Sequence, residues 1–238
     1  MDGVINIYKE KGFTSHDVVA VARRILKQRK IGHTGTLDPL AEGVLPICVG
    51  KATKLADYIM GGIKGYRANI TLGVTTDTQD AGGTVLERRD VTVTRAEIEE
   101  CVYSFVGSYD QTPPMYSAIK VNGQRLYKLA RAGEVIERKP RRVEISGISV
   151  VEFISDTEAV IDVACGKGTY IRALCADIGE KLGCGAFMSA LLRTRSGAFA
   201  LDSAITLGRL QILADEGRVD EVLIPPDRVD SIKREGKP

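Results

Sequence analysis

The order of helical and strand segments places the tightest limit on what this chain can fold into. Apolar residues at helical spacing follow Ser15, whereas apolar runs over 44–50, 66–74 and 141–166 are typical of strands. The two kinds of segment do not alternate in the regular rhythm that a doubly wound parallel sheet requires. The sequence therefore predicts an α+β protein with a mixed, largely antiparallel sheet.

Capping residues predict where two of the helices begin. Ser15 is predicted to cap a helix that ends at the basic residues of 27–30. Thr94 and Glu97 form a capping box for a helix that runs to about Phe105. Further helices are expected over 51–60, 124–133 and 168–183 and after Thr206, with a polar loop over 75–83 and a hairpin over 141–166.

The residue types that carry chemistry exclude several functional classes. Five cysteines, an odd number without CxxC spacing, lie mostly in apolar segments and are predicted to be reduced and buried. With two histidines, no zinc or other metal site is expected. Neither a phosphate-binding GxxxxGK[ST] loop nor a GxGxxG turn is present, so no cofactor is predicted. Chemistry must then come from carboxylates, tyrosines and arginines.

The apolar runs are too short for a membrane span, since none reaches 18 residues. The first residues, MDGVINIYKEKG, lack the pattern of a signal peptide. We therefore expect a cytoplasmic protein that does not contact a membrane.

Asp38 stands out in the stretch GHTGTLDPLAEGVLPICVG, which covers residues 32–50. An aspartate before proline is commonly a turn residue whose carboxylate accepts backbone hydrogen bonds. Three features favour a catalytic role instead: the glycines Gly32 and Gly35 permit a tight turn, polar groups are dense, and a strand follows that can hold the loop rigidly.

Two further residues are candidates for the same site. Arg172, in CGKGTYIRA, lies among apolar residues and is predicted to be a buried ion-pair partner for a carboxylate such as Asp38. Tyr66 opens a strand after a glycine-rich turn. It is either a core tyrosine or a platform on which a nucleic-acid base stacks.

The basic residues are concentrated in one segment. Residues 120–142 contain eight basic and two acidic residues, a net charge of +6, whereas the whole chain has +2 and the rest therefore −4. Such a segment is either a solvated surface or a clamp for a phosphate backbone. Its tyrosines and glycines, with Tyr116 and Tyr127 in or beside it, are compatible with a mobile nucleic-acid clamp.

Four motifs together carry a family resemblance. They are GHTGTLDPLAEGVLPICVGKATKL, KGYRANITLGVTTDTQDAGG, PPMYSAIKVNGQRLYKLARAG and CGKGTYIRALCADIGEKLGCGA, in this order. In these motifs the chain resembles the bacterial tRNA pseudouridine synthase B family from about residue 3 to about 226. The resemblance implies the pseudouridine synthase fold with a central RNA-binding cleft, and a monomer that isomerises uridine 55 in the T loop of tRNA without a cofactor.

The resemblance also assigns roles to single residues. Asp38 matches the catalytic aspartate, Arg172 the arginine that pairs with it, and Tyr66 the tyrosine that stacks on the target base. His33 matches a histidine that helps to hold the T loop with the uridine flipped out. Tyr170 and Leu191 match residues that line the base pocket.

The same resemblance divides the chain. It implies a catalytic domain over 1–226, with a basic insertion over about 107–142 that closes over the RNA stem-loop. The polar tail over 227–238 lies where a small C-terminal RNA-binding domain would begin.

Three alternatives stay open at this point. The first is a guide-RNA-dependent pseudouridine synthase of the archaeal and eukaryotic branch, and the second is an RNA-folding or RNA-binding protein whose catalysis is secondary. The third is a non-catalytic protein in which Asp38 is a turn residue.

Overall fold

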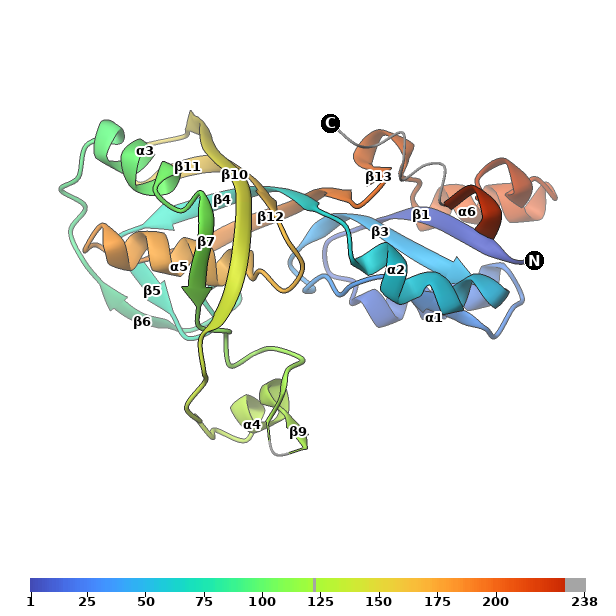
Figure 1. Cartoon of the computed structure of the whole chain (residues 1–238), viewed down its shortest axis with the longest axis horizontal. Helices are drawn as coiled ribbons and strands as arrows, with labels where there is room; N and C mark the ends of the chain where they lie inside the picture. Colours follow the sequence, from blue (N-terminus) through green and yellow to red (C-terminus); the bar gives the residue numbers. More distant parts are fainter. Residues whose placement is uncertain (122, 230–238) are drawn as a thin grey trace. The chain divides into compact units, whose positions relative to one another are not determined.

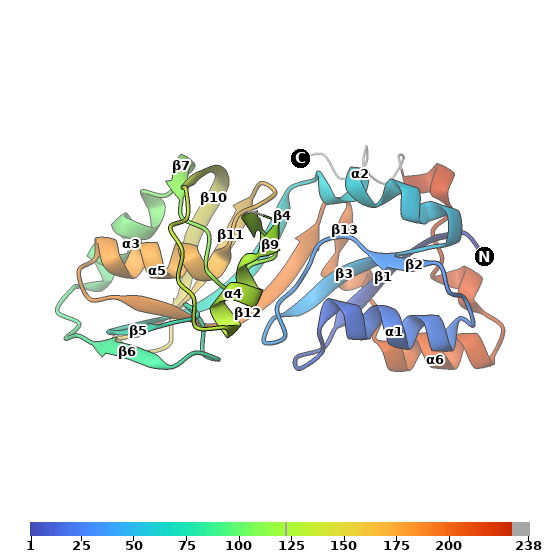
Figure 2. The same ribbon diagram turned by 90° about the horizontal axis from the view of Figure 1, so that it is seen from below.

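The computed structural model describes residues 1–121 and 123–229 (Figures 1 and 2). Its contacts divide the chain into two compact units. Unit 1 comprises Met1–Tyr66 and the chain from Leu191 onward, and unit 2 comprises Arg67–Ala190. Beyond Val229, the predicted polar tail lies outside the described residues.

The sheet of unit 1 is built around strand β3 (Glu42–Val49). It pairs antiparallel with β1 (Gly3–Lys9) and β2 (Ile31–His33), and parallel with β12 (Ala186–Ser196), whose last residues belong to this unit. Short strand β13 (Phe199–Ala200) pairs antiparallel with β12.

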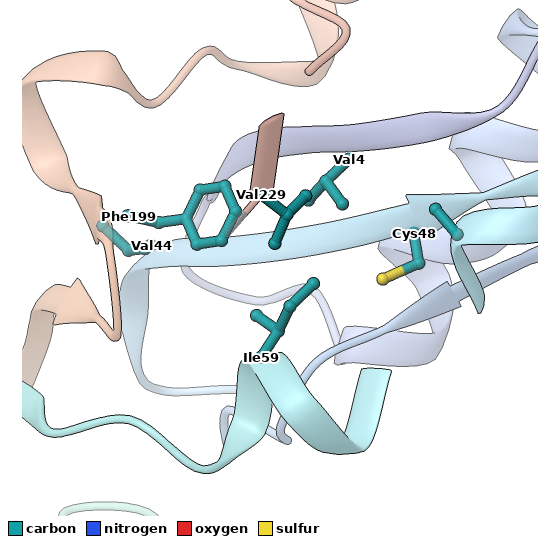
Figure 3. Packing of buried hydrophobic residues seen from close by; sticks show 7 residues of the cluster. Val4, Val44, Cys48, Ile59, Phe199 and Val229 are labelled. Carbon is teal, nitrogen blue, oxygen red and sulfur yellow. The ribbon is translucent and has the colours of Figure 1, made fainter. Parts of the chain in front are cut away.

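Strands β1 and β3 are buried on both faces, which explains their nearly continuous apolar sequence. Ile5 lies opposite Ile47 on one face and Val4 opposite Cys48 on the other, and all four side chains are fully buried. Figure 3 shows the cluster around Val4. Its members are Val4, Val44, Cys48, Ala52, Ile59, Phe199 and Val229.

Helices cover both faces of these strands. In Figure 2, strands β1–β3 lie between α2 (Ala56–Met60) on one side and α1 (Ser15–Ile25) and α6 (Leu207–Asp215) on the other. Residues 51–60, predicted as one short helix, are a 3-10 helix, Gly50–Leu55, continued by α2. The helix predicted after Thr206 is α6, and Thr206 is its N-cap. Short 3-10 turns occupy Leu201–Ser203, Val219–Glu221 and Pro226–Arg228.

The predicted cap of α1 is wrong by one residue. Thr14, in the extended conformation, is the N-cap, and it forms a capping box with Asp17. Ser15 is already helical and buried, and its hydroxyl bonds to Leu37 instead. A hydroxyl that finds a tertiary partner is not available as a cap, and the sequence alone shows no such partner.

In unit 2 the hydrogen-bonded strand order is β12-β4-β11-β10-β7. The predicted hairpin over 141–166 is confirmed, because β10 (Arg141–Phe153) pairs antiparallel with β11 (Glu158–Cys165). Strand β7 (Gly107–Gln111) pairs antiparallel with the start of β10, and β4 is Lys64–Leu72. Strand β3 pairs parallel with β12 and antiparallel with β1, and β10 pairs antiparallel with β11 and β7, so the sheet is mixed and largely antiparallel, as predicted.

Helices α3 (Arg95–Tyr103) and α5 (Ile171–Lys181) supply much of the core of unit 2. The capping box of Thr94 and Glu97 is confirmed. The helix expected from 168 begins three residues later, because Gly168 has a φ of +86° that no right-handed helix contains. Strands β5 (Val74–Thr76) and β6 (Val85–Arg88) form a hairpin. The first two residues of the segment 75–83, which was predicted to be a loop, therefore belong to β5.

Two sequence expectations concern the whole of the described chain. All five cysteines are buried thiols that form no disulfide among the described residues, as predicted. Within residues 1–121 and 123–229, no helix is long and apolar enough to cross a membrane.

Candidate functional site

Asp38 lies in unit 1, in a segment that comprises the end of β2 and its connection to β3 and is here called the Asp38 loop (residues 32–41). Its start continues the β2–β3 pairing, with His33 opposite Ile47. Gly35 has a φ of +89°, which favours glycine at the point where the loop turns away. Asp38 is half-buried, so its carboxylate has access to solvent while the backbone of the loop is fixed.

Hydrogen bonds to buried groups hold the backbone of this loop on both sides of Asp38. The Ser15 hydroxyl accepts from the Leu37 N–H at 2.9 Å and donates to the Leu37 carbonyl at 3.2 Å. The backbone N–H and the hydroxyl of Thr34 both donate to the Pro46 carbonyl at 3.0 Å. After the aspartate, the Pro39 carbonyl accepts from the Gly12 N–H at 2.8 Å. A catalytic loop requires this rigidity.

Two buried cations lie close to the Asp38 loop. The Lys9 ammonium, whose residue is fully buried, donates to the carbonyls of Phe13 at 2.7 Å and Pro39 at 3.5 Å. Burial lowers the pKa of Lys9 to about 8, although Asp38 is the strongest of the charges that raise it. Arg193, 1% exposed, donates through Nε to the Val44 carbonyl at 2.6 Å. Sequence reasoning missed both cations. A single basic residue in an apolar strand is often solvated, and the sequence gives no sign that these two are buried.

The remaining predicted residues of unit 1 are His33, Tyr66 and Leu191. The half-buried His33 ring packs edge-on against His16, with ring centroids 5.1 Å apart. Burial and the charges of His16 and Arg193 lower the pKa of His33, which keeps its ring neutral near pH 7. Tyr66 in β4 and Leu191 in β12 are both buried.

In unit 2, the glycine-containing turn before α5 and the first two residues of that helix are here called the Arg172 turn (residues 166–172). Gly166 donates its N–H to the Glu144 carbonyl at 2.9 Å, and Thr169 donates its hydroxyl to the Gly166 carbonyl at 3.1 Å. Tyr170, half-buried, is the N-cap residue of α5. Arg172 therefore lies in the first turn of the helix.

Arg172 is buried and paired with a carboxylate, as an arginine among apolar residues predicts. Its guanidinium lies 3.8 Å from the Asp80 carboxylate, which is also buried. The same guanidinium donates to the carbonyls of Tyr116 at 2.7 Å and Thr78 at 3.4 Å. The predicted pairing of Arg172 with Asp38 concerns residues of different units and stays a prediction.

Asp80 is a residue that sequence reasoning missed, because it was placed in a polar loop. Its carboxylate accepts from the Thr78 hydroxyl at 2.6 Å and from the Gly82 N–H at 2.9 Å. The signal was present in TTDTQDAGG, where an aspartate precedes a small-residue turn that its side chain can cap. The ion-pair partner of Asp80, Arg172, lies far along the chain, and no local sequence pattern indicates the pairing.

The predicted basic insertion leaves the sheet of unit 2 at Gln111 and returns at Arg141, which are register partners (Figure 1). It contains short strands β8 (Lys120–Val121) and β9 (Gln124–Arg125) and helix α4 (Leu126–Arg131). Leu126 anchors it as a fully buried side chain. Exposed basic residues in and beside the segment are Arg125, Lys128, Lys139, Arg141 and Arg142.

The described part of the chain offers no cluster of three or more His, Cys, Asp and Glu side chains placed to hold a metal ion. Among the candidate residues, the structure describes the Asp38 carboxylate in unit 1 and the Arg172–Asp80 pair in unit 2.

Family comparisons match nearly the whole chain. Residues 23–171 match the family described as TruB family pseudouridylate synthase, N-terminal domain. Residues 172–229 match the tRNA pseudouridylate synthase B C-terminal domain.

Curated relatives named tRNA pseudouridine synthase B are similar over most of the chain. The protein from Alkaliphilus oremlandii is 54% identical over 227 residues, which cover 95% of this chain and 75% of the relative. That from Clostridium perfringens is 55% identical over 208 residues, covering 87% and 71%. That from Pseudomonas fluorescens is 51% identical over 230 residues, covering 95% and 75%.

Solved structures share the fold at lower identity. A Cbf5–Nop10–Gar1 complex matches with a TM-score of 0.75 and 32% identity over 97% of this chain. An H/ACA ribonucleoprotein bound to a substrate RNA containing 2′-deoxyuridine matches with a TM-score of 0.73 and 30% identity over 97%. This chain covers 62% and 61% of the length of those two structures.

Proposed function

The chain belongs to the TruB family of pseudouridylate synthases, and on this premise we propose that it converts uridine 55 in the T loop of tRNA to pseudouridine. The observation that carries the proposal is the 54% identity, over 95% of the chain, to a relative named tRNA pseudouridine synthase B. The structures of H/ACA assemblies are more distant, at 30–32% identity, so a guide-dependent enzyme is not favoured.

The reaction breaks the N1–C1′ bond of uridine, turns the base and joins C5 to C1′. The proton on C5 leaves, N1 gains one, and the product is an isomer that needs no redox partner or cofactor. We assign the nucleophile of covalent catalysis to Asp38, whose backbone is held at Leu37 and Pro39. Attack on the sugar, attack on the base and removal of a sugar proton are all compatible with this carboxylate.

The other predicted residues act on the flipped base or on Asp38. We assign to Arg172 the pairing with Asp38 and to Tyr66 stacking on the base, with removal of the C5 proton as a second role for its hydroxyl. Tyr170 and Leu191 line the base pocket in this proposal. A neutral His33, supported by its lowered pKa, helps to hold the T loop without adding charge.

The basic insertion is the proposed contact with the RNA stem-loop. Its net charge of +6 over 120–142 suits a phosphate backbone, and the exposed Arg125 and Lys128 are placed in it. We further propose a monomer that acts in the cytoplasm, with 1–226 as its catalytic domain and the RNA in a central cleft.

The test is release of tritium from tRNA labelled with [5-³H]uridine. Wild type should release tritium, also from a bare T stem-loop, and Asp38→Ala and Asp38→Asn should lower the rate at least about 1,000-fold because the nucleophile is lost. Both variants should bind tRNA with a Kd within about two-fold of wild type. Release by the variants at the wild-type rate would disprove the role of Asp38. Absence of release by wild type on bound tRNA would disprove the function.

A further inference from the structure

Gln111 is a buried amide at the last residue of β7, where the basic insertion leaves the sheet of unit 2. Its side chain belongs to a residue that is 1% exposed, so it cannot contact RNA directly. A buried amide requires partners for its oxygen and for both of its N–H groups. Those partners show what the residue does.

The amide of Gln111 binds both backbone groups of Tyr170. Its Oε1 accepts from the Tyr170 N–H at 2.8 Å, and its Nε2 donates to the Tyr170 carbonyl at 3.1 Å. The second N–H of Nε2 donates to the Tyr109 hydroxyl. A flipped amide would place N–H against N–H and oxygen against oxygen, so the orientation follows from the partners. Gln111 thus pairs with Tyr170 much as a neighbouring strand would.

Two further side chains, those of Tyr109 and Asp177, link the Gln111 amide to α5 at a second point. The Tyr109 hydroxyl donates to the Asp177 carboxylate at 3.3 Å, and Asp177 lies on α5 itself. Gln111 is therefore fixed between two points of the same helix, its N-cap at Tyr170 and its second turn at Asp177. This arrangement restricts the rotation of α5 relative to β7.

The position of the helix start decides where Arg172 reaches. Tyr170 accepts the first helical bond, from the Leu174 N–H at 3.0 Å, so its peptide sets the direction of the first turn. Two residues later, the Arg172 guanidinium donates to the Tyr116 carbonyl, which belongs to the insertion that begins after Gln111. Two contacts therefore join the root of the insertion to the start of α5.

We propose that Gln111 is a positioning residue that sets the placement of Tyr170 and Arg172 for catalysis. The inference rests on the proposed function, because it is the isomerisation step that these two residues serve. A displacement of about 1 Å in a reacting site costs about 100-fold in rate. Affinity for RNA, by contrast, depends on exposed basic residues such as Arg125 and Lys128. The loss of Gln111 should therefore lower kcat and leave binding almost unchanged.

The first experiment compares Gln111→Met with wild type in single-turnover tritium release at saturating tRNA. Methionine keeps the volume of glutamine and removes all three hydrogen bonds. We expect the rate to fall about 10- to 100-fold, with a Kd for tRNA within about two-fold of wild type. Ile161→Val, a fully buried change on β11, is the control for general loss of packing and should keep its rate. A wild-type rate for folded Gln111→Met would overturn the proposal.

The second experiment uses Gln111→Glu to separate positioning from packing. An ionised glutamate still accepts from the Tyr170 N–H but has no proton for the Tyr170 carbonyl. Protonation restores one donor, so the ratio of the variant rate to the wild-type rate should rise as the pH falls from 8 to 5. Titration of Tyr109 and Asp177 is common to both proteins and cancels to first order in the ratio. A ratio that does not change with pH would contradict the proposal.

A third measurement does not depend on activity. The Tyr170 amide should exchange with deuterium faster in Gln111→Met than in wild type and Ile161→Val, because its acceptor is gone. If wild type releases no tritium, the proposed function fails, while this exchange still decides whether Gln111 holds Tyr170. Unchanged exchange at Tyr170 would overturn the inference even in an active enzyme.

Discussion

The Asp38 loop of unit 1 and the Arg172 turn of unit 2 both contain glycine and a charged residue that is a candidate for catalysis, yet they are held differently. Ser15 and Lys9 bind the main chain of the Asp38 loop across 22 and 30 residues of sequence, and Thr34, within the loop, binds the main chain of β3 12 residues further on. Partners of the Arg172 turn lie 56, 59 and 94 residues away. In the Arg172 turn, the guanidinium of Arg172 itself makes contacts that hold the segment in place.

This difference separates two ways of building a reactive group. In the Asp38 loop the backbone is fixed and the carboxylate is left half-buried, which suits a group that reacts. In the Arg172 turn the guanidinium is buried and joins three segments of unit 2. A change at Arg172 should therefore affect stability as well as chemistry, whereas a change at Asp38 should affect chemistry.

Arg172→Met should give the largest effect on stability. It leaves the buried Asp80 without its cation, and losing one member of a buried pair costs about 3–5 kcal/mol. The free energy of unfolding from denaturant titration measures this. The control Arg67→Met removes an exposed pair with Asp162 and should change the free energy of unfolding far less, because solvent screens that pair. Equal losses in the two variants would show that Arg172 has no structural role beyond that of a surface arginine.

Ser15→Ala should have a smaller effect and act on the Asp38 loop. It removes both hydrogen bonds to Leu37 and leaves two backbone groups unpaired, which costs about 1–3 kcal/mol. Ser146→Ala, where an exposed hydroxyl donates to the Ala164 carbonyl, is the matched control and should be nearly neutral. Denaturant titration of both variants tests the comparison, and a neutral Ser15→Ala would mean that other bonds suffice to hold this loop.

The smallest predicted effect concerns Asp177 and depends on pH. Burial raises the pKa of Asp177 from 3.8 to about 6, so the folded state holds its proton more tightly than the unfolded state. Its contribution to stability is therefore greatest below pH 4 and decreases as the pH rises through 6. Relative to Asp177→Asn, wild type should lose about 1–2 kcal/mol between pH 4 and pH 7, after allowance for partial exposure. Parallel stability curves for the two proteins would contradict this assignment.

Short-range patterns predicted most of the elements. The Thr94–Glu97 capping box, the hairpin of β10 and β11 and the buried cysteines are all found where the sequence places them. The cap of α1 was misplaced because Thr14 and Ser15 are adjacent and chemically alike. Which of the two hydroxyls caps the helix depends on Leu37, which lies 22 residues beyond Ser15.

The sequence by itself determined the family, the class of sheet and the loop that carries Asp38, because spacing and propensity act over a few residues and are legible in one stretch. The tertiary structure alone decided that Asp80 faces Arg172 and that Gln111 holds Tyr170. Their side chains are 92 and 59 residues apart in the chain. A hydrogen bond or ion pair forms at about 3–4 Å, and only the folded chain brings such distant groups within that range.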